Sequence, residues 1–245
     1  MNPVDEFFRD RRDDIEKMDR DEDLKRKSLE WMIASDKYKY SYNFTWLGRP
    51  IIKYPSDIVA TQEIIWRVKP DLIIETGVAH GGSLILSASM LEMLGGNRRV
   101  IGIDIDIRAH NRKEIEEHPL FKRIDLVEGS SVAPETLMRV RELSAGYENV
   151  MVFLDSLHTH AHVAAELKMY APMVNVGSYL VLPDTFIEYF PKGHYAHDRP
   201  WDVGNNPMTA LREFMQTSSD FEVDRELNGK LLITEAFDGY LRRIR

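Results

Sequence analysis

From residue 56 onward, the chain alternates between short apolar runs and longer segments in which apolar residues recur at helical spacing. Ser56 or Asp57 can cap the first of these segments, which ends before Pro70. The short runs are continuously apolar, as is typical of strands in a parallel sheet that helices cover on both faces. We therefore predict strands at 71–75, 100–104, 124–128, 150–154 and 179–182, separated by helices at 83–94, 111–118, 132–144 and 161–170.

The C-terminal part departs from this alternation. After a predicted helix at 209–216, two strand-like runs at 221–227 and 230–237 flank Asn228-Gly229. This dipeptide favours a tight turn between antiparallel strands. The whole pattern predicts an α/β fold with a doubly wound, mostly parallel seven-stranded sheet that finishes in a C-terminal antiparallel hairpin.

The first 55 residues follow a different pattern. Charged residues dominate positions 1–27, which is typical of a helical arm that packs weakly or joins copies of the chain in a homo-oligomer; a lid over a site is the alternative. Aromatic residues follow at Tyr38, Tyr40, Tyr42, Phe44 and Trp46. They can pack in the interior or stack on a flat ligand. We assign residues 1–55 to a helical arm and aromatic cap segment, and residues 56–245 to the main domain.

The composition limits the metal ligands and the partners that the protein can use. The 245 residues include no cysteine, which excludes disulfides and thiolate metal sites and leaves His, Asp and Glu as metal ligands. The formal charge of −8 disfavours a nucleic-acid or anionic-membrane partner. No apolar run approaches the roughly 20 residues of a membrane span, and the N-terminus lacks the pattern of an export signal. We expect a cytoplasmic protein without membrane insertion that acts on a small molecule.

The first predicted strand ends in a glycine-rich turn, with Gly77 and Gly81 shortly after Glu75. Such a turn lets a ligand approach the backbone at the start of a helix; the alternative is a tight turn that only packs helix against strand. The turn fits neither the dinucleotide nor the ATP motif. At the tip of the second strand, Asp104 can accept hydrogen bonds from both hydroxyls of a ribose, although Asp106 competes for this role. Glu75 suits a cationic ligand group, so the turn and Asp104 predict a nucleoside-binding corner.

Two further carboxylates, Asp155 and Asp184, follow the fourth and fifth predicted strands. Because neighbouring parallel strands end at the same edge of a sheet, these side chains should converge, and a cation between them would offset their charge. Oxygen ligands of this kind suit Mg²⁺. The alternative is that Asp155 caps a helix and Asp184 is an ordinary loop carboxylate.

These motifs together resemble those of the class I S-adenosylmethionine (SAM)-dependent methyltransferases, whose fold is Rossmann-like. The resemblance rests on the turn Glu75-x-Gly77-x-x-x-Gly81-Gly82-Ser83, on Asp104, on Gly129-Ser130-Ser131 and on Asp155. It implies SAM as the cofactor. The residues that it places in cofactor binding are Glu75, Gly77, Ala79, Gly81, Ser83, Asp104, Ser130, Ser131 and Asp155.

Segments 69–77, 102–108 and 154–158 more closely resemble the cephalosporin hydroxylase/rhamnosyl O-methyltransferase family, as does Trp46-Leu47-Gly48-Arg49-Pro50 upstream. The resemblance covers about residues 38–240. In the related metal-dependent O-methyltransferases, one metal ligand follows strand four and two adjacent ligands follow strand five. The outer two positions match Asp155 and Asp184, whereas the middle position holds Pro183, which offers no side-chain ligand.

The resemblance also implies a general base at His158, three residues after Asp155. We predict that His158 as the base and Asp155 as the metal ligand beside it are both catalytic. A sugar hydroxyl is a weak acid, and methyl transfer to it needs a base within hydrogen-bond reach; imidazole suits this task near neutral pH. The next two histidines, His160 and His162, are expected to begin the following helix as surface or structural residues.

An aromatic-rich segment at 186–206 is expected to form either a substrate lid or a surface loop. The sequence thus favours a SAM-dependent O-methyltransferase that acts on a hydroxyl of a sugar or antibiotic/natural-product scaffold with the help of Mg²⁺. One alternative is a hydroxylase of a β-lactam-type antibiotic, although none of the 8 histidines is followed two residues later by the acid that commonly completes an iron site. A non-catalytic SAM-binding partner subunit is the other.

Overall fold

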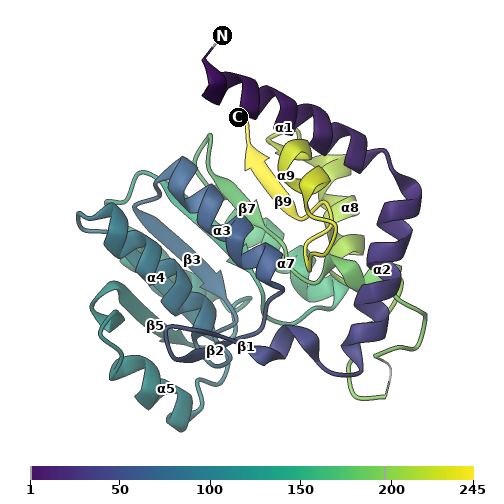
Figure 1. Cartoon of the computed structure of the whole chain (residues 1–245). Helices are drawn as coiled ribbons and strands as arrows, with labels where there is room; N and C mark the ends of the chain where they lie inside the picture. Colours follow the sequence, from purple (N-terminus) through teal and green to yellow (C-terminus); the bar gives the residue numbers. More distant parts are fainter. Residues whose placement is uncertain (1, 196) are drawn as a thin grey trace.

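The computed structural model describes residues 2–195 and 197–245, which build a twisted seven-stranded sheet with the order β5-β4-β3-β6-β7-β9-β8. The five strands from β5 to β7 are parallel, and β9 runs antiparallel to both of its neighbours (Figure 1). The strands are β3 (Leu72–Thr76), β4 (Arg99–Asp104), β5 (Ile124–Glu128), β6 (Val150–Leu154), β7 (Tyr179–Val181), β8 (Phe221–Val223) and β9 (Tyr240–Arg243). The predicted doubly wound fold is confirmed.

Helices cover both faces of this sheet. One apolar core joins the sheet to α3 (Pro55–Val68), α4 (Gly82–Leu94), α5 (Ala109–Glu116) and α9 (Arg225–Lys230). The other joins it to α6 (Pro134–Leu143), α7 (His160–Tyr170) and α8 (Pro207–Thr217). All five residues of β3 are buried, with Ile73 in the first core and Ile74 in the second, which explains the uninterrupted apolar run in its sequence.

The C-terminal strands β8 and β9 are antiparallel as predicted, but the turn predicted between them at Asn228-Gly229 is wrong. Residues Asn228 and Gly229 lie inside α9, and the second antiparallel strand begins only at Tyr240. The Asp224 side chain caps α9 by accepting a hydrogen bond from Leu227 N–H at 2.9 Å. A β-carbon on Gly229 would lie 3.0 Å from a side-chain atom of α1, so tertiary packing has overridden the local turn signal.

The predicted caps of α3 are also wrong, because Pro55 begins the helix one residue earlier. Asp57 is buried and accepts hydrogen bonds from Glu235 N–H at 2.9 Å and from the Tyr240 hydroxyl at 2.8 Å. Ser56 donates to the carbonyl of Ile233. Both side chains therefore anchor the segment between α9 and β9, which the sequence pattern presents as a strand.

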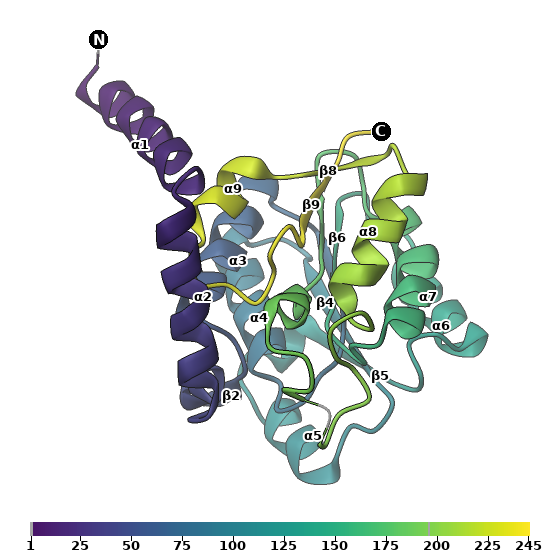
Figure 2. The same cartoon turned by 90° about the vertical axis from the view of Figure 1, so that its right-hand side faces the viewer.

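The N-terminal extension consists of α1 (Pro3–Asp19) and α2 (Glu22–Asp36), followed by the 3₁₀ helix η1 (Tyr40–Asn43) and a hairpin of β1 (Phe44–Trp46) and β2 (Arg49–Ile51). Figure 2 shows that α1 projects beyond the body of the molecule, whereas α2 lies along it. The division of the chain at residue 55 stays a prediction. Within the described residues, no helix combines the length and the apolar character that crossing a membrane would require.

Candidate active site

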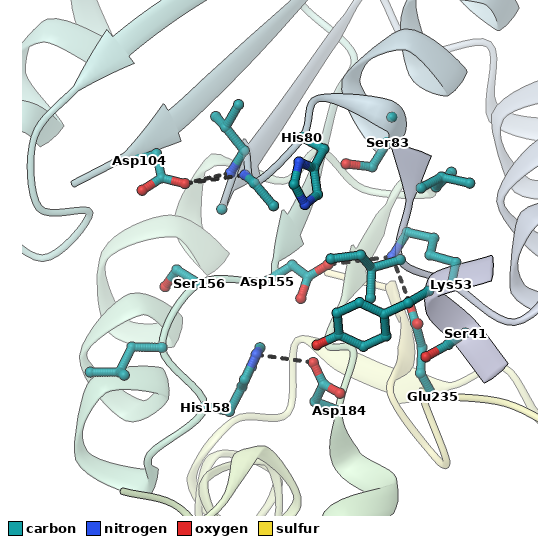
Figure 3. A pocket seen from close by; sticks show the side chains of 18 of the residues that line it. Ser41, Lys53, His80, Ser83, Asp104, Asp155, Ser156, His158, Asp184 and Glu235 are labelled. Atoms are coloured by element: carbon teal, nitrogen blue, oxygen red, sulfur yellow. Dashed lines mark hydrogen bonds and ion pairs between the residues drawn. The ribbon is translucent and has the colours of Figure 1, made fainter. Parts of the chain in front are cut away.

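A cavity of about 710 Å³ opens at the carboxyl ends of the parallel strands. Asp104 lies at one end and the pair of His158 and Asp184 at the other, with Asp155 between them (Figure 3). The predicted site residues that line this cavity are Gly77, Ala79, Ser83, Asp104, Ser130, Ser131, Asp155, His158 and Asp184. Neither Glu75 nor Gly81 is among the lining residues.

The glycine-rich turn after β3 is held in one conformation. Gly77 has φ +92°, and a β-carbon there would lie 1.8 Å from the carbonyl oxygen of Asp155, so no other residue fits. The Asp104 carboxylate accepts hydrogen bonds from the N–H groups of Val78 at 2.8 Å and Ala79 at 3.3 Å (Figure 3). Arg49 donates to the carbonyl of His80, in the same turn, at 2.8 Å. Asp104 and Arg49 therefore fix the shape of the wall that a ligand would contact.

Glu75 lies beneath this turn, and only 2% of its surface is exposed. Burial raises its pKa to about 7, although the charge of Lys53 and a hydrogen bond with Ser83 oppose this rise. The carboxyl group is therefore buried behind the lining of the cavity and is not part of it.

Lys53 is a site residue that the sequence pattern did not reveal. Its side chain is 5% exposed, and its ammonium lies 2.5 Å from Glu235 Oε1 and 3.4 Å from Asp155 Oδ2 (Figure 3). Burial opposes the charged form, but the carboxylates of Glu235, Asp155 and Glu75 raise the pKa of Lys53 well above its ordinary value. The cavity therefore contains one permanent buried cation among several acids. The only signal in the sequence is a lone charge in the otherwise apolar run 51–54.

Three side chains meet at the far end of the cavity. His158 Nε2 lies 3.2 Å from Asp184 Oδ2, and one donor atom each from Asp155, His158 and Asp184 lies within 4.8 Å of the others. Burial raises the pKa of Asp184, against the opposing effect of His158. Asp184 has φ +58°, an uncommon conformation for a residue with a side chain, which aims it into the cavity. The two carboxylates offer the oxygen ligands that a hard divalent cation prefers, and the imidazole of His158 lies beside them.

The aromatic segment after β7 lies over this end of the cavity. The Trp201 ring meets the His158 ring edge to face at 4.7 Å, and Tyr195 and Arg199 also line the cavity. Asp36 of α2 accepts a hydrogen bond from His194 Nε2 at 2.7 Å, which connects the N-terminal extension to this segment. The extension and the aromatic segment together form a roof over the end that contains His158.

The two histidines expected to be surface or structural residues, His160 and His162, differ in position. His160 points outward and contacts Thr209 and Glu213 of α8. By contrast, His162 lines the cavity, and its Nε2 lies 3.1 Å from Ser131 Oγ. A spacing of two residues places them on different faces of α7, and the sequence pattern did not indicate which face turns inward.

Comparison with known proteins agrees with this arrangement. Residues 38–244 match the family described as Rhamnosyl O-methyltransferase/CmcI. The chain belongs to this family. It is 30% identical over 219 residues to the rhamnosyl O-methyltransferase of Mycobacterium leprae, which covers 86% of this chain and 90% of that protein. The identity to the rhamnosyl O-methyltransferase of Mycobacterium tuberculosis is 30% over 220 residues, covering 86% and 85%. Family membership makes the chain an O-methyltransferase.

Solved structures show the same fold. A structure of CmcI with Mg and SAM superposes with a TM-score of 0.58 at 21% identity and covers 83% of this chain and 78% of that chain. An O-methyltransferase from Bacillus cereus in complex with SAH gives a TM-score of 0.55 at 14% identity, with 89% and 91% covered. These likenesses confirm the class I methyltransferase fold predicted for this chain.

Proposed function

We propose that this family member transfers the methyl group of SAM to a hydroxyl of a sugar or of a glycosylated natural product, with help from Mg²⁺. The observation that carries the proposal is one continuous cavity with a nucleoside-type corner at Asp104 and a cluster of carboxylates and imidazole at Asp155, His158 and Asp184. The related proteins named above are rhamnosyl O-methyltransferases, and the CmcI structure contains Mg and SAM.

The corner at Asp104 fits the nucleoside of SAM. Oδ2 of Asp104 accepts the two N–H groups of the turn, and Oδ1 accepts Asp106 N–H at 3.1 Å, so the carboxylate retains about one lone pair, on Oδ1, for a ribose hydroxyl. Ser130 and Ser131 line the adjoining wall. When bound, SAM would supply an activated methyl group, and Mg²⁺ held by Asp155 and Asp184 would lower the pKa of the acceptor hydroxyl.

The pair of His158 and Asp184 fits the task of removing the hydroxyl proton. If His158 Nε2–H donates to Asp184 across their 3.2 Å contact, the other ring nitrogen, Nδ1, remains a proton acceptor. Asp184 then orients the ring and stabilises the imidazolium that forms, as a buried carboxylate does beside a catalytic histidine. Trp201 restricts the ring from the side.

Lys53 stabilises the buried carboxylates beside this pair. Its ammonium compensates the charges of Glu235 and Asp155, which burial would otherwise penalise. We infer that Lys53 positions Asp155 and touches neither the acceptor nor the methyl group.

The acceptor end is lined by aromatic side chains of Tyr42, Tyr54, Phe186, Tyr195 and Trp201. Such surfaces stack on sugar rings and on flat scaffolds. We therefore propose a neutral glycoside as the acceptor, with a deoxysugar hydroxyl as the first candidate. A cytoplasmic location, a homo-oligomeric state and a role in antibiotic biosynthesis stay predictions that belong to this proposal.

The hydroxylase alternative receives less support from the site. A non-haem iron oxygenase commonly uses two histidines and one carboxylate. Within the described residues, the candidate metal cluster has one histidine and two carboxylates.

A pair of histidine variants tests the proposal. We expect His158→Ala to bind SAM with the affinity of the wild type, measured by calorimetry, but to lose about 10²- to 10⁴-fold in methyl transfer. The control His160→Ala, a histidine of the same helix region that faces away from the cavity, should retain both. A wild-type protein that shows no SAM binding at millimolar concentration would reject the proposal.

A further inference from the structure

A second cluster of polar side chains lies on the cavity wall beside Ser131, away from the pair of His158 and Asp184. His162 Nε2 lies 2.9 Å from Ser156 Oγ and 3.1 Å from Ser131 Oγ. The hydroxyl of Ser156 donates to Glu166 Oε1 at 2.7 Å, and the same oxygen lies 3.4 Å from His162 Nε2. Tyr170 donates to the Ser131 carbonyl at 2.7 Å and holds this part of the wall in place.

The cluster contains a serine, a histidine and an acid but cannot act as a nucleophilic triad. In such a triad, the serine and the acid contact opposite ring nitrogens, so that the imidazole passes a proton between them. Here Ser156 and Glu166 approach the same nitrogen, Nε2, and Ser156 gives its proton directly to Glu166. The cluster must therefore hold a proton in place rather than transfer it.

The hydrogen bonds determine which nitrogen of His162 carries the proton. An ionised Glu166 only accepts, so the single hydroxyl proton of Ser156 is committed to it. Ser156 Oγ must then accept from His162, which places a hydrogen on Nε2. In a neutral ring, Nδ1 is left as an acceptor. The side chain of His162 is 15% exposed and lines the cavity, while its Nε2 edge is occupied by the cluster.

Glu166 is costly to keep in this place. It is completely buried, and its Oε2 has no hydrogen-bond partner within the described part of the chain. Burying a carboxylate with incomplete hydrogen bonding is unfavourable, so packing alone does not account for an acid at this position. A role in fixing the proton of His162 on Nε2 accounts for the acid.

The surroundings of the cluster suit a flat heterocycle. Two large apolar side chains line the cavity and yet remain exposed, Ile105 at 73% and Leu157 at 40%. Ile105 directly follows Asp104, and Leu157 directly follows Ser156. Ser131 and His162 line the same cavity as these two apolar side chains.

We propose that Glu166 and His162 form a positioning and specificity device that reads the 6-amino group of the nucleobase. The proposal rests on the proposed function, which supplies SAM as the nucleoside ligand. The amino group donates to Nδ1 of His162. A 6-oxo group at the same place is itself an acceptor, so it would face Nδ1 without a hydrogen bond between them. A site built around such a hydrogen bond rejects an analogue that lacks the donor.

The test is calorimetric titration with S-adenosylhomocysteine and with its 6-oxo counterpart, S-inosylhomocysteine. The wild type should bind the amino form at least about tenfold more tightly. His162→Leu and Glu166→Gln should bring the two dissociation constants to within about twofold of each other, and His160→Ala should keep the wild-type ratio. A merely structural role would weaken both ligands equally and leave the ratio unchanged.

Three results would contradict the role assigned to His162, and the third also contradicts the proposed function. Equal binding of the two ligands by the wild type overturns the proposal, whether or not the variants fold. A wild-type ratio that survives in both folded variants overturns it as well. If the wild type binds neither ligand, the proposed function itself fails, and the role assigned to His162 falls with it.

Discussion

Removal of the Lys53 ammonium should destabilise the protein far more than removal of an ordinary lysine. In Lys53→Met, a side chain of similar length replaces the cation, and Glu235 and Asp155 lose their partner. The side chains of Lys53 and Glu235 are 5% and 9% exposed, so this is a buried ion pair rather than a surface one. Breaking a buried pair by removing one partner costs about 3–5 kcal/mol.

For a chain of this size, such a loss lowers Tm by roughly 6–20 °C, which differential scanning calorimetry would resolve. The control Lys113→Met removes a lysine that is 70% exposed and pairs with Glu117 on the surface of α5; it should change the stability by no more than about 0.5 kcal/mol.

A double variant separates loss of the pair from loss of packing. Glu235→Gln removes the charge that Lys53 neutralises, so the double variant Lys53→Met/Glu235→Gln should recover about 2 kcal/mol relative to the sum of the single effects. If the two single effects simply add, or if Lys53→Met costs less than about 1 kcal/mol, the reasoning that a buried charge pair organises the floor of the cavity is wrong.

Three further predictions concern the cofactor corner, the C-terminal segment and the metal. Asp104→Ala should weaken SAM binding at least about tenfold in calorimetry, because the turn loses two charge-assisted hydrogen bonds; unchanged affinity would mean that Asp104 has no part in the corner. Burial raises the pKa of Asp224, but hydrogen bonds from Tyr179 and Leu227 N–H and the charge of Arg67 lower it overall. Asp224→Asn should therefore cost about 1–2 kcal/mol at pH 7 in urea unfolding. The difference should begin to shrink below the ordinary value of about 3.9 and vanish once the pH falls through the lower pKa of the folded protein; a constant difference would reject the charge argument. EDTA should abolish methyl transfer and added Mg²⁺ should restore it in the wild type but not in Asp184→Asn; full activity in chelator would exclude the metal.

The parallel sheet could be predicted because its inner strands β3, β6 and β7 are buried along their whole length and are therefore almost continuously apolar in the sequence. The C-terminal segment could not, because Asn228-Gly229 lies in α9, a helix that packs against α1, more than two hundred residues earlier. Local strand propensities span only about 1 kcal/mol and are readily overridden by packing of that kind.

The site residues divide in the same way, into those that the local sequence predicts and those that it does not. Gly77, Asp104, Asp155 and Asp184 lie at strand ends, where the rule for open α/β sheets places ligands, so their convergence could be predicted. Lys53 pairs with residues that are 102 and 182 positions away in the sequence, and nothing local indicates either partner. In the same way, the inward position of His162 follows from the rotation of α7 against the sheet, which the polar pattern around it does not specify.

The most direct test of the central claim is transfer of a deuterated methyl group from SAM to a rhamnosyl glycoside, followed by mass spectrometry of the product. The site described here predicts a labelled methyl ether on one sugar hydroxyl, formed by the wild type and not by His158→Ala. An acceptor that gains oxygen in place of the labelled methyl group would contradict it.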